Sequence, residues 1–150
     1  MSDSDSYDLP QDRFYHPRDH TWSQVREADG SQVRIGMDAM QLDNLGELAY
    51  IQLQPPGTVV KAGDSIGTLE AAKMTAEIFA PVSGTIELVN DSVLTQPLLV
   101  NQQPYGEGWL LQLTPSDWTA DSAALIGGAD IEAWAVAEEA RFKAEFDASA

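Results

Sequence analysis

The sequence predicts a mainly β domain, a small sandwich or barrel, with a short helix near its start and a longer one at its end. Short apolar stretches, several of them alternating with polar residues, are separated by turn signals at regular intervals between residues 47 and 113. After Gly127-Gly128 the composition becomes rich in alanine and glutamate, as in a helix. A chain of 150 residues fits one domain with a buried core.

The first elements are expected in residues 33–53. Residues 33–35 form a strand candidate after the turn signal Asp29-Gly30. Residues 37–45 favour a short helix, because their apolar side chains fall roughly on one side and Gly46 can end it. Residues 47–53 have strand periodicity, which puts three side chains on each face: Ala49, Ile51 and Leu53 on one, Leu48, Tyr50 and Gln52 on the other.

Further strands are expected at residues 58–60, 65–69, 75–80 and 85–89, and a last one carries the alternating Trp109, Leu111 and Leu113. In the strand at 85–89, Ile86 and Leu88 should point the same way. Asp130 is a good N-cap for a helix over residues 130–146. Its apolar stripe, which we expect to pack on the barrel, consists of Ile131, Trp134, Phe142 and Phe146.

Composition excludes several classes of function. The net charge is −16, from 24 acids and 8 bases, so nucleic acid or an anionic membrane would repel the chain. The acidity is expected to serve solubility or docking onto basic partner surfaces. The chain has no cysteine, which removes disulfides, thiol nucleophiles and thiolate metal sites. With no membrane-length apolar run and no signal-peptide pattern at residues 1–12, a cytoplasmic location is expected.

The two histidines, His16 and His20, give little support for a metal or acid–base site. Pro17 interrupts the helix that would align them, and no carboxylate constellation lies nearby in the sequence. No metal is therefore expected.

Of the three lysines, Lys73 has the most informative position. Lys61 lies in an ordinary turn and Lys143 on the terminal helix, whereas Lys73 lies between two strand-like segments, where the chain must reverse. A lysine there projects its stem into solvent, clear of the body of the protein, as acylation by another enzyme would require. From the residues alone, a merely solvated turn lysine remains the simpler interpretation.

The surroundings of Lys73 resemble a known attachment motif. Glu70-Ala71-Ala72-Lys73-Met74, followed by Ala80-Pro81-Val82-Ser83-Gly84, is similar to the motif of the biotinyl/lipoyl-domain superfamily. The resemblance implies covalent lipoate on Lys73. It also implies that Glu70 and Gly84 are recognised by the lipoylating enzyme.

The flanking segments narrow the resemblance. His20-Thr21-Trp22, Gly46-Glu47-Leu48-Ala49-Tyr50, Val100-Asn101 and Pro104-Tyr105-Gly106-Glu107-Gly108-Trp109-Leu110 resemble the glycine cleavage system H-protein family. The resemblance implies a lipoyl-type flattened β-barrel or sandwich hybrid of two small sheets, spanning residues 13–118. Residues 1–12 would be a flexible acidic tail, and residues 119–150 a helical extension packed on the same domain. The protein would be a monomeric, non-catalytic carrier with a swinging lipoamide arm.

Two departures from the H-protein pattern bear on the partner system. The attachment sequence usually reads Glu-Ser-Val-Lys-Ala, and the segment after Gly36 usually carries Thr-Asp-Tyr/Phe-Ala where this chain has Asp38-Ala39-Met40-Gln41. These departures favour the H-like lipoate-binding protein of bacterial sulfur oxidation, with a heterodisulfide-reductase-like complex as partner. The alternative is glycine cleavage, with its enzymes as partners and an aminomethyl group as cargo. Either system implies a lipoate ligase or lipoyl-transfer enzyme and a dihydrolipoamide dehydrogenase-like enzyme. Met74 also fits the pattern of biotin carriers, a third possibility.

Overall fold

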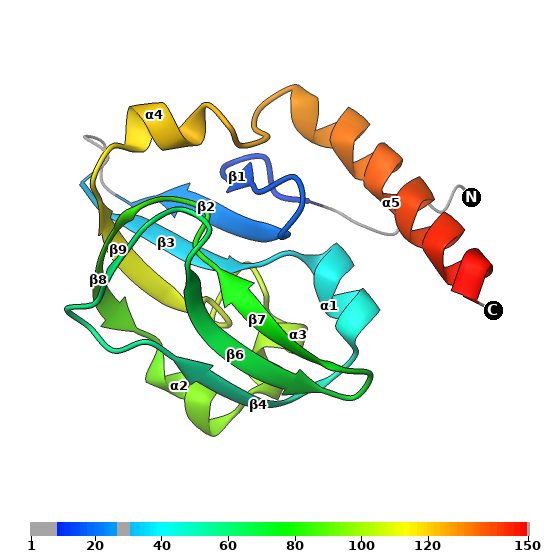
Figure 1. The fold of residues 1–150 in the computed structure, drawn as a ribbon, viewed down its shortest axis with the longest axis horizontal. Coiled ribbons are helices and arrows are strands. Elements are labelled where there is room, and N and C mark those ends of the chain that lie inside the picture. Colours follow the sequence, from blue (N-terminus) through cyan, green and yellow to red (C-terminus); the bar gives the residue numbers. More distant parts are fainter. Residues whose placement is uncertain (1–8, 27–30, 150) are drawn as a thin grey trace.

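The computed structural model describes residues 9–26 and 31–149, with side chains up to residue 145 (Figure 1). Within these residues the chain forms nine strands and five helices. The strands are β1 (Phe14–Tyr15), β2 (Thr21–Val25), β3 (Val33–Met37), β4 (Leu48–Leu53), β5 (Val59–Val60), β6 (Ser65–Ala71), β7 (Thr75–Phe79), β8 (Gly84–Val89) and β9 (Leu111–Pro115). The helices are α1 (Ala39–Leu45), α2 (Asp91–Thr95), α3 (Leu98–Gln102), α4 (Trp118–Ser122) and α5 (Asp130–Ser149).

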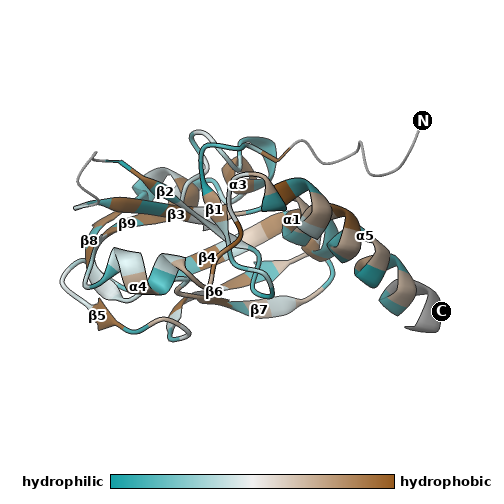
Figure 2. Cartoon of the chain, turned by 90° about the horizontal axis from the view of Figure 1, so that it is seen from above, coloured by the Kyte–Doolittle hydropathy of each residue, from teal (hydrophilic) through white to brown (hydrophobic). Residues whose placement is uncertain are grey.

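The described strands form two sheets, which confirms the predicted mainly β fold. The larger has six strands in the order β1-β2-β3-β9-β8-β5, and the smaller has three in the order β4-β6-β7. Every pairing in both sheets is antiparallel. Seen from above, the sheets form two layers, and α5 projects from one end of them (Figure 2).

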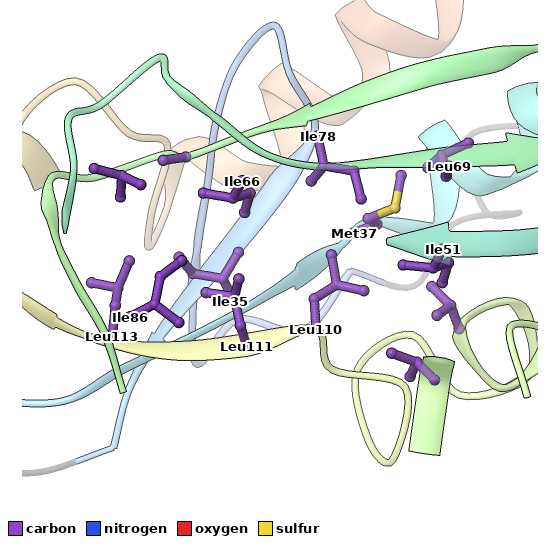
Figure 3. Close-up of a cluster of buried hydrophobic side chains, with 14 of the residues drawn as sticks. Ile35, Met37, Ile51, Ile66, Leu69, Ile78, Ile86, Leu110, Leu111 and Leu113 are labelled. Atoms are coloured by element: carbon purple, nitrogen blue, oxygen red, sulfur yellow. The ribbon is translucent and has the colours of Figure 1, made fainter. Parts of the chain in front are cut away.

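The main core lies between the two sheets (Figure 3). Side chains from both sheets point into this space, as expected for a two-layer sandwich. The six-stranded sheet contributes Ile35, Ile86, Leu111 and Leu113, and the three-stranded sheet contributes Ile51, Ile66, Leu69 and Ile78, each at most 3% exposed.

A second, smaller core joins the terminal segments to the sandwich. Its buried members are Leu9, Tyr15, Trp22, Met40 and Ile131, and the α5 residues Trp134 and Phe142 pack against them. The predicted C-terminal helix is confirmed, and these contacts fix it to the domain; the side chain of Phe146 lies outside the described residues. Residues 1–8 of the predicted tail also lie outside them, while Leu9 is 6% exposed and therefore packed on the domain.

Two β-bulges change the faces that strict alternation predicted. In β4 the register shifts between Leu48 and Tyr50, so Leu48 is buried together with Ile51, on the face that alternation gave to Ala49. In β8 it shifts between Ile86 and Leu88, so Ile86 is 1% exposed and Leu88 is 52% exposed. The expectation that Ile86 and Leu88 point together is wrong, because an extra residue in one strand reverses the following side chains.

The sequence did not reveal β1, β2 or the short helices α2 to α4. In β2, Thr21, Trp22 and Ser23 are all buried, which hides the alternation that marks a strand. The short helix begins at Ala39, two residues later than predicted, because Met37 is still part of β3 and Asp38 is the N-cap. The turn predicted at Asp29-Gly30 lies outside the described residues.

Candidate functional site

The site is built on the hairpin of β6 and β7. Cross-strand pairs Leu69 with Ala76 and Glu70 with Thr75 lead to the turn, which closes with the amide of Ala71 donating to the carbonyl of Met74 (2.9 Å). Leu69 is buried in the core, whereas the turn residues 72–74 are exposed. The base of the hairpin is therefore fixed by packing while its tip faces solvent.

Lys73 lies in this turn, as predicted, but it is not clear of the body of the protein. Its Nζ donates a hydrogen bond to the backbone oxygen of Asp43, in the last turn of α1 (3.2 Å). Carbonyls at a helix C-terminus lack intrahelical partners and carry partial negative charge, which favours a cation there. The exposed lysine thus lies along the end of α1, with its amine accessible from outside.

The backbone of the turn is held by the segment that connects α1 to β4. The amide of Lys73 donates to the carbonyl of Leu45 (3.1 Å), and that of Ala72 donates to the carbonyl of Glu47 (2.9 Å). Between them, Gly46 has a φ of +84°, and a Cβ at this position would lie 3.3 Å from the Cβ of Ala72. The backbone therefore turns and approaches closely at a position that favours glycine. Figure 1 shows this connection beside the tip of the hairpin.

A side chain from α3 holds the other side of the same segment. The amide nitrogen of Asn101 donates to the carbonyl of Gly46 (3.0 Å), and its side-chain oxygen accepts from the amide of Leu48 (2.9 Å). The sequence offered one signal for this residue, the Val100-Asn101 pair in the H-protein resemblance, but no role for it.

An open cleft of about 560 Å³ lies beside Lys73. Its lining combines polar groups with a few apolar side chains, among them Leu42, Asp43, Glu47, Asn101 and Pro104. Within residues 9–26 and 31–149, no group of three histidine, cysteine or acidic side chains could hold a metal ion. What this region offers chemically is an exposed primary amine on a fixed backbone, which suits attachment of an acyl group.

Of the other two predicted site residues, only Glu70 lies with Lys73. It is an exposed residue of β6, near the end of the same hairpin. Gly84 is at the start of β8, in the six-stranded sheet, whereas the Lys73 hairpin belongs to the three-stranded sheet. A Cβ on Gly84 would lie 2.3 Å from the backbone oxygen of Thr114 on β9. Gly84 thus has a packing reason to be glycine, and the role of both residues in recognition stays a prediction.

Sequence reasoning missed a buried ionic cluster around His20. Its Nδ1 lies 2.7 Å from a carboxylate oxygen of Asp38, and its Nε2 lies 2.8 Å from one of Glu138. Glu138 in turn accepts two hydrogen bonds from Arg141 (2.9 and 3.0 Å). The carboxylate constellation is therefore present, but Glu138 is 118 residues away along the chain.

The charges in this cluster shift the pKa values of its members. Burial alone would lower the pKa of His20, but hydrogen bonds and charge from Asp38 and then Glu138 outweigh it and raise that pKa. Hydrogen bonds from Arg141 and then His20 lower the pKa of Glu138, despite its burial. In its protonated form the His20 ring can donate to both carboxylates and so links α5 to the N-cap of α1.

Comparison with known proteins identifies the family. The family model described as "Glycine cleavage H-protein" matches residues 14–138. This chain belongs to that family. The glycine cleavage system H protein of Mycobacterium avium is 38% identical over 127 residues, which cover 85% of this chain and 94% of that protein. The protein of the same name from Thermus thermophilus is 40% identical over 110 residues, or 73% of this chain and 83% of that protein.

The fold agrees with a solved structure of the family. The crystal structure of a glycine cleavage system H protein from Mycobacterium marinum superimposes with a TM-score of 0.72 at 32% identity, covering 83% of this chain and 96% of that one. Members of the H-protein family are non-catalytic carriers with lipoate bound covalently to a lysine. The expected family, fold and cofactor are confirmed, and the biotin alternative has no support. Among the described helices, none has both the length and the apolar character needed to cross a bilayer.

Proposed function

We propose that this H-protein family member is the lipoyl carrier of a glycine cleavage system, with lipoate attached to Lys73. The main support for Lys73 as the attachment site is its position, exposed in the turn of a hairpin whose base is buried. Lys61 and Lys143 do not have such a position, since one follows the edge strand β5 and the other lies on α5. When bound, lipoate supplies a dithiolane whose sulfur atoms take up and release the cargo.

The residues around Lys73 fit such a group. The amides of the turn donate to the carbonyls of Leu45 and Glu47, so the attachment point has a defined place, while the amine itself donates to the Asp43 carbonyl. An amide at this nitrogen would keep one N–H donor for the same carbonyl. The adjoining cleft leaves room for the start of a long side chain.

The relatives support glycine cleavage over the sulfur-oxidation system that the sequence departures favoured. The matched proteins at 38–40% identity carry the name of the glycine cleavage system H protein, and so does the matched crystal structure. Asp38, one of the departures, has a structural role here, because it caps α1 and pairs with His20. That departure therefore needs no separate partner system to explain it.

In this function the partners are the enzymes of glycine cleavage, a dihydrolipoamide dehydrogenase, and a ligase or transfer enzyme that attaches lipoate. The contribution of the carrier is tethering, because a second encounter with the cargo becomes effectively intramolecular. Glu70, exposed in the same hairpin, is in a suitable place to be read by the lipoylating enzyme.

The experiment begins with lipoylation of the purified full-length protein by a lipoate–protein ligase, with Lys73→Arg as the test variant and Lys61→Arg as its matched control. Mass spectrometry should show one lipoyl adduct on wild type and Lys61→Arg, and none on Lys73→Arg. The lipoylated protein is then given to glycine decarboxylase with glycine, and release of carbon dioxide is measured. Glycine-dependent turnover with wild type and Lys61→Arg is the expected result.

Two outcomes would contradict parts of the proposal. A lipoyl adduct on Lys73→Arg would move the attachment point to another lysine. Complete lipoylation without glycine-dependent turnover would remove the glycine cleavage function and leave a lipoyl carrier for another system, with sulfur oxidation next to be assayed.

A further inference from the structure

We propose that Asn101 is a positioning residue for acylation of Lys73: by clamping residues 46–48 it holds the hairpin turn in the form that the lipoylating enzyme accepts. The inference rests on the proposed attachment of lipoate to Lys73. It gives a function to a residue whose side chain hydrogen-bonds to Gly46 and Leu48, in the segment beside the turn.

Two hydrogen bonds hold the turn from outside the hairpin. The acceptors for the amides of Ala72 and Lys73 are the carbonyls of Glu47 and Leu45. Neither acceptor belongs to β6 or β7, so the orientation of the turn depends on where the 45–48 segment lies. A hairpin tip with only its own closing bond would keep more conformational freedom.

Asn101 fixes that segment at the two residues that flank Glu47. It donates to the carbonyl of Gly46 and accepts from the amide of Leu48. One side chain therefore holds the peptide groups on both sides of Glu47, whose carbonyl accepts from the amide of Ala72. The bonds alternate along the segment: carbonyls 45 and 47 face the hairpin, while carbonyl 46 and amide 48 face Asn101. Rotation of the 47–48 peptide would disturb both sets, because it carries the Glu47 carbonyl and the Leu48 amide.

The backbone that carries Asn101 is itself fixed by packing. The neighbouring Val100 is fully buried, and a Cβ on Gly108 would lie 2.6 Å from the carbonyl oxygen of Leu99 and 2.8 Å from the Cα of Val100, so α3 packs closely on the following loop. Asn101 therefore presents its amide from a fixed backbone. The segment it holds has other attachments, the Gly46 amide to the Leu42 carbonyl and the pairing of Leu48 with Ala71. Loss of Asn101 should consequently loosen the turn without unfolding the domain.

The size of the effect follows from two ordinary hydrogen bonds. Each changes a local equilibrium by about three- to tenfold, so losing both should lower the ratio of ordered to disordered turn by about tenfold or more. A partner that accepts only the ordered form then binds more weakly in proportion to the lost ordered fraction, a factor no larger than the change in that ratio, while bound protein reacts normally. The KM for the carrier should rise by up to about tenfold and kcat should be unchanged.

The test compares Asn101→Ala and Asn101→Asp with Asn90→Ala in the full-length protein. Asn101→Asp keeps the size and the acceptor but loses the donor to Gly46, so it preserves the packing if Asn101→Ala is unstable. Asn90 is the matched control, a buried asparagine whose amide donates to the carbonyls of Glu107 and Trp109, away from the hairpin. Kinetics of lipoylation are measured with a lipoate–protein ligase, with unmodified carrier as the varied substrate, at a temperature where circular dichroism shows every variant folded.

Hydrogen exchange of the Ala72 and Lys73 amides in the unmodified protein supplies a second measurement that needs no ligase. Asn101→Ala should exchange these amides about tenfold faster or more, Asn101→Asp about three- to tenfold faster, and both should raise KM by up to the same factors, whereas Asn90→Ala should change neither by more than about twofold. Unchanged exchange and KM in the Asn101 variants, or an equal rise in Asn90→Ala, would overturn the clamp. If wild type takes no lipoate, the assignment of Lys73 fails, and the exchange rates still decide whether Asn101 orders the turn.

Discussion

Neutralising Glu138 should destabilise the protein in a manner that depends on pH. Glu138→Gln keeps the size of the side chain and an oxygen for His20, but it removes the charge that faces the imidazolium at 2.8 Å. His20 is 1% exposed and keeps Asp38 as a second carboxylate, so its charge is not left unpartnered. We therefore expect a loss of one charge-assisted buried hydrogen bond, about 1.5–3 kcal/mol, rather than the ~3–5 kcal/mol of a wholly broken buried pair.

The sign of the pH dependence follows from the pKa shifts of His20 and Glu138. The pKa of His20 is raised above its ordinary value of 6.5, so its contribution is complete below pH 6.5 and is lost as the pH rises through the folded-state pKa. The pKa of Glu138 is lowered below its ordinary value of 4.5, so its contribution is present above pH 4.5 and is lost as the pH falls through the folded-state pKa. Wild type should therefore exceed Glu138→Gln in stability by most between pH 4.5 and pH 6.5.

The assay is thermal unfolding by circular dichroism from pH 4 to pH 9. For a domain of this size the expected difference in Tm is about 3–12 °C at its maximum, shrinking towards both ends of the range. Part of the Tm difference should remain at high pH, because Glu138 of the wild type still pairs with Arg141, whose guanidinium stays charged. Arg141→Gln is the control: its side chain is 44% exposed, so we expect a loss of less than about 1 kcal/mol that is level above pH 4.5 and shrinks only below it, because Arg141 lowers the pKa of Glu138. A Tm difference for Glu138→Gln that is flat across this range would refute the ionic account of the cluster.

Four further substitutions test the fold and the turn. Gly84→Ala places a Cβ 2.3 Å from the Thr114 carbonyl and should lower stability by about 1–3 kcal/mol, while an unchanged lipoylation rate in the folded protein would argue against recognition of Gly84. Gly46→Ala, at a φ of +84° and a ψ of −167°, a region that is essentially restricted to glycine, should cost about 1–3 kcal/mol in chemical denaturation, and no loss would contradict the need for glycine there. Leu88→Asp should change stability by less than about 0.5 kcal/mol and Ile86→Ala should cost about 2–5 kcal/mol, whereas equal losses would contradict the bulge in β8.

The elements that the sequence predicted are those with a local signal. Apolar alternation on both sides of a turn predicts the hairpin around Lys73. Gly127-Gly128 and the N-cap candidate Asp130 predict the start of α5. The bulges of β4 and β8 have no such signal, because a bulge depends on the register of the partner strand. Alternation within one strand therefore predicted Leu88 on the wrong face.

The candidate site also has a part that the sequence predicted and a part that it did not. Lys73 could be found because its motif is contiguous, but its contacts come from α1 and the 45–48 segment, which a linear motif does not contain. The partners of His20 show the same difficulty, since Asp38 and Glu138 lie 18 and 118 residues away. Both features depend on contacts between distant segments, which a single sequence does not display.

The support of the hairpin explains why a carrier needs more than an exposed lysine. A group that visits several active sites must be long and mobile, yet each partner must find its attachment point in the same place, because ordering a loose tip would cost free energy at every encounter. Here the backbone of residues 72 and 73 is fixed by hydrogen bonds to a neighbouring segment, while the side chain of Lys73 is exposed and its amine donates to the Asp43 carbonyl. Freedom is thus confined to the side chain and whatever is attached to it. If the clamp by Asn101 sets that boundary, loosening it should harm every step in which a partner must recognise the tip and leave the chemistry of the arm unchanged.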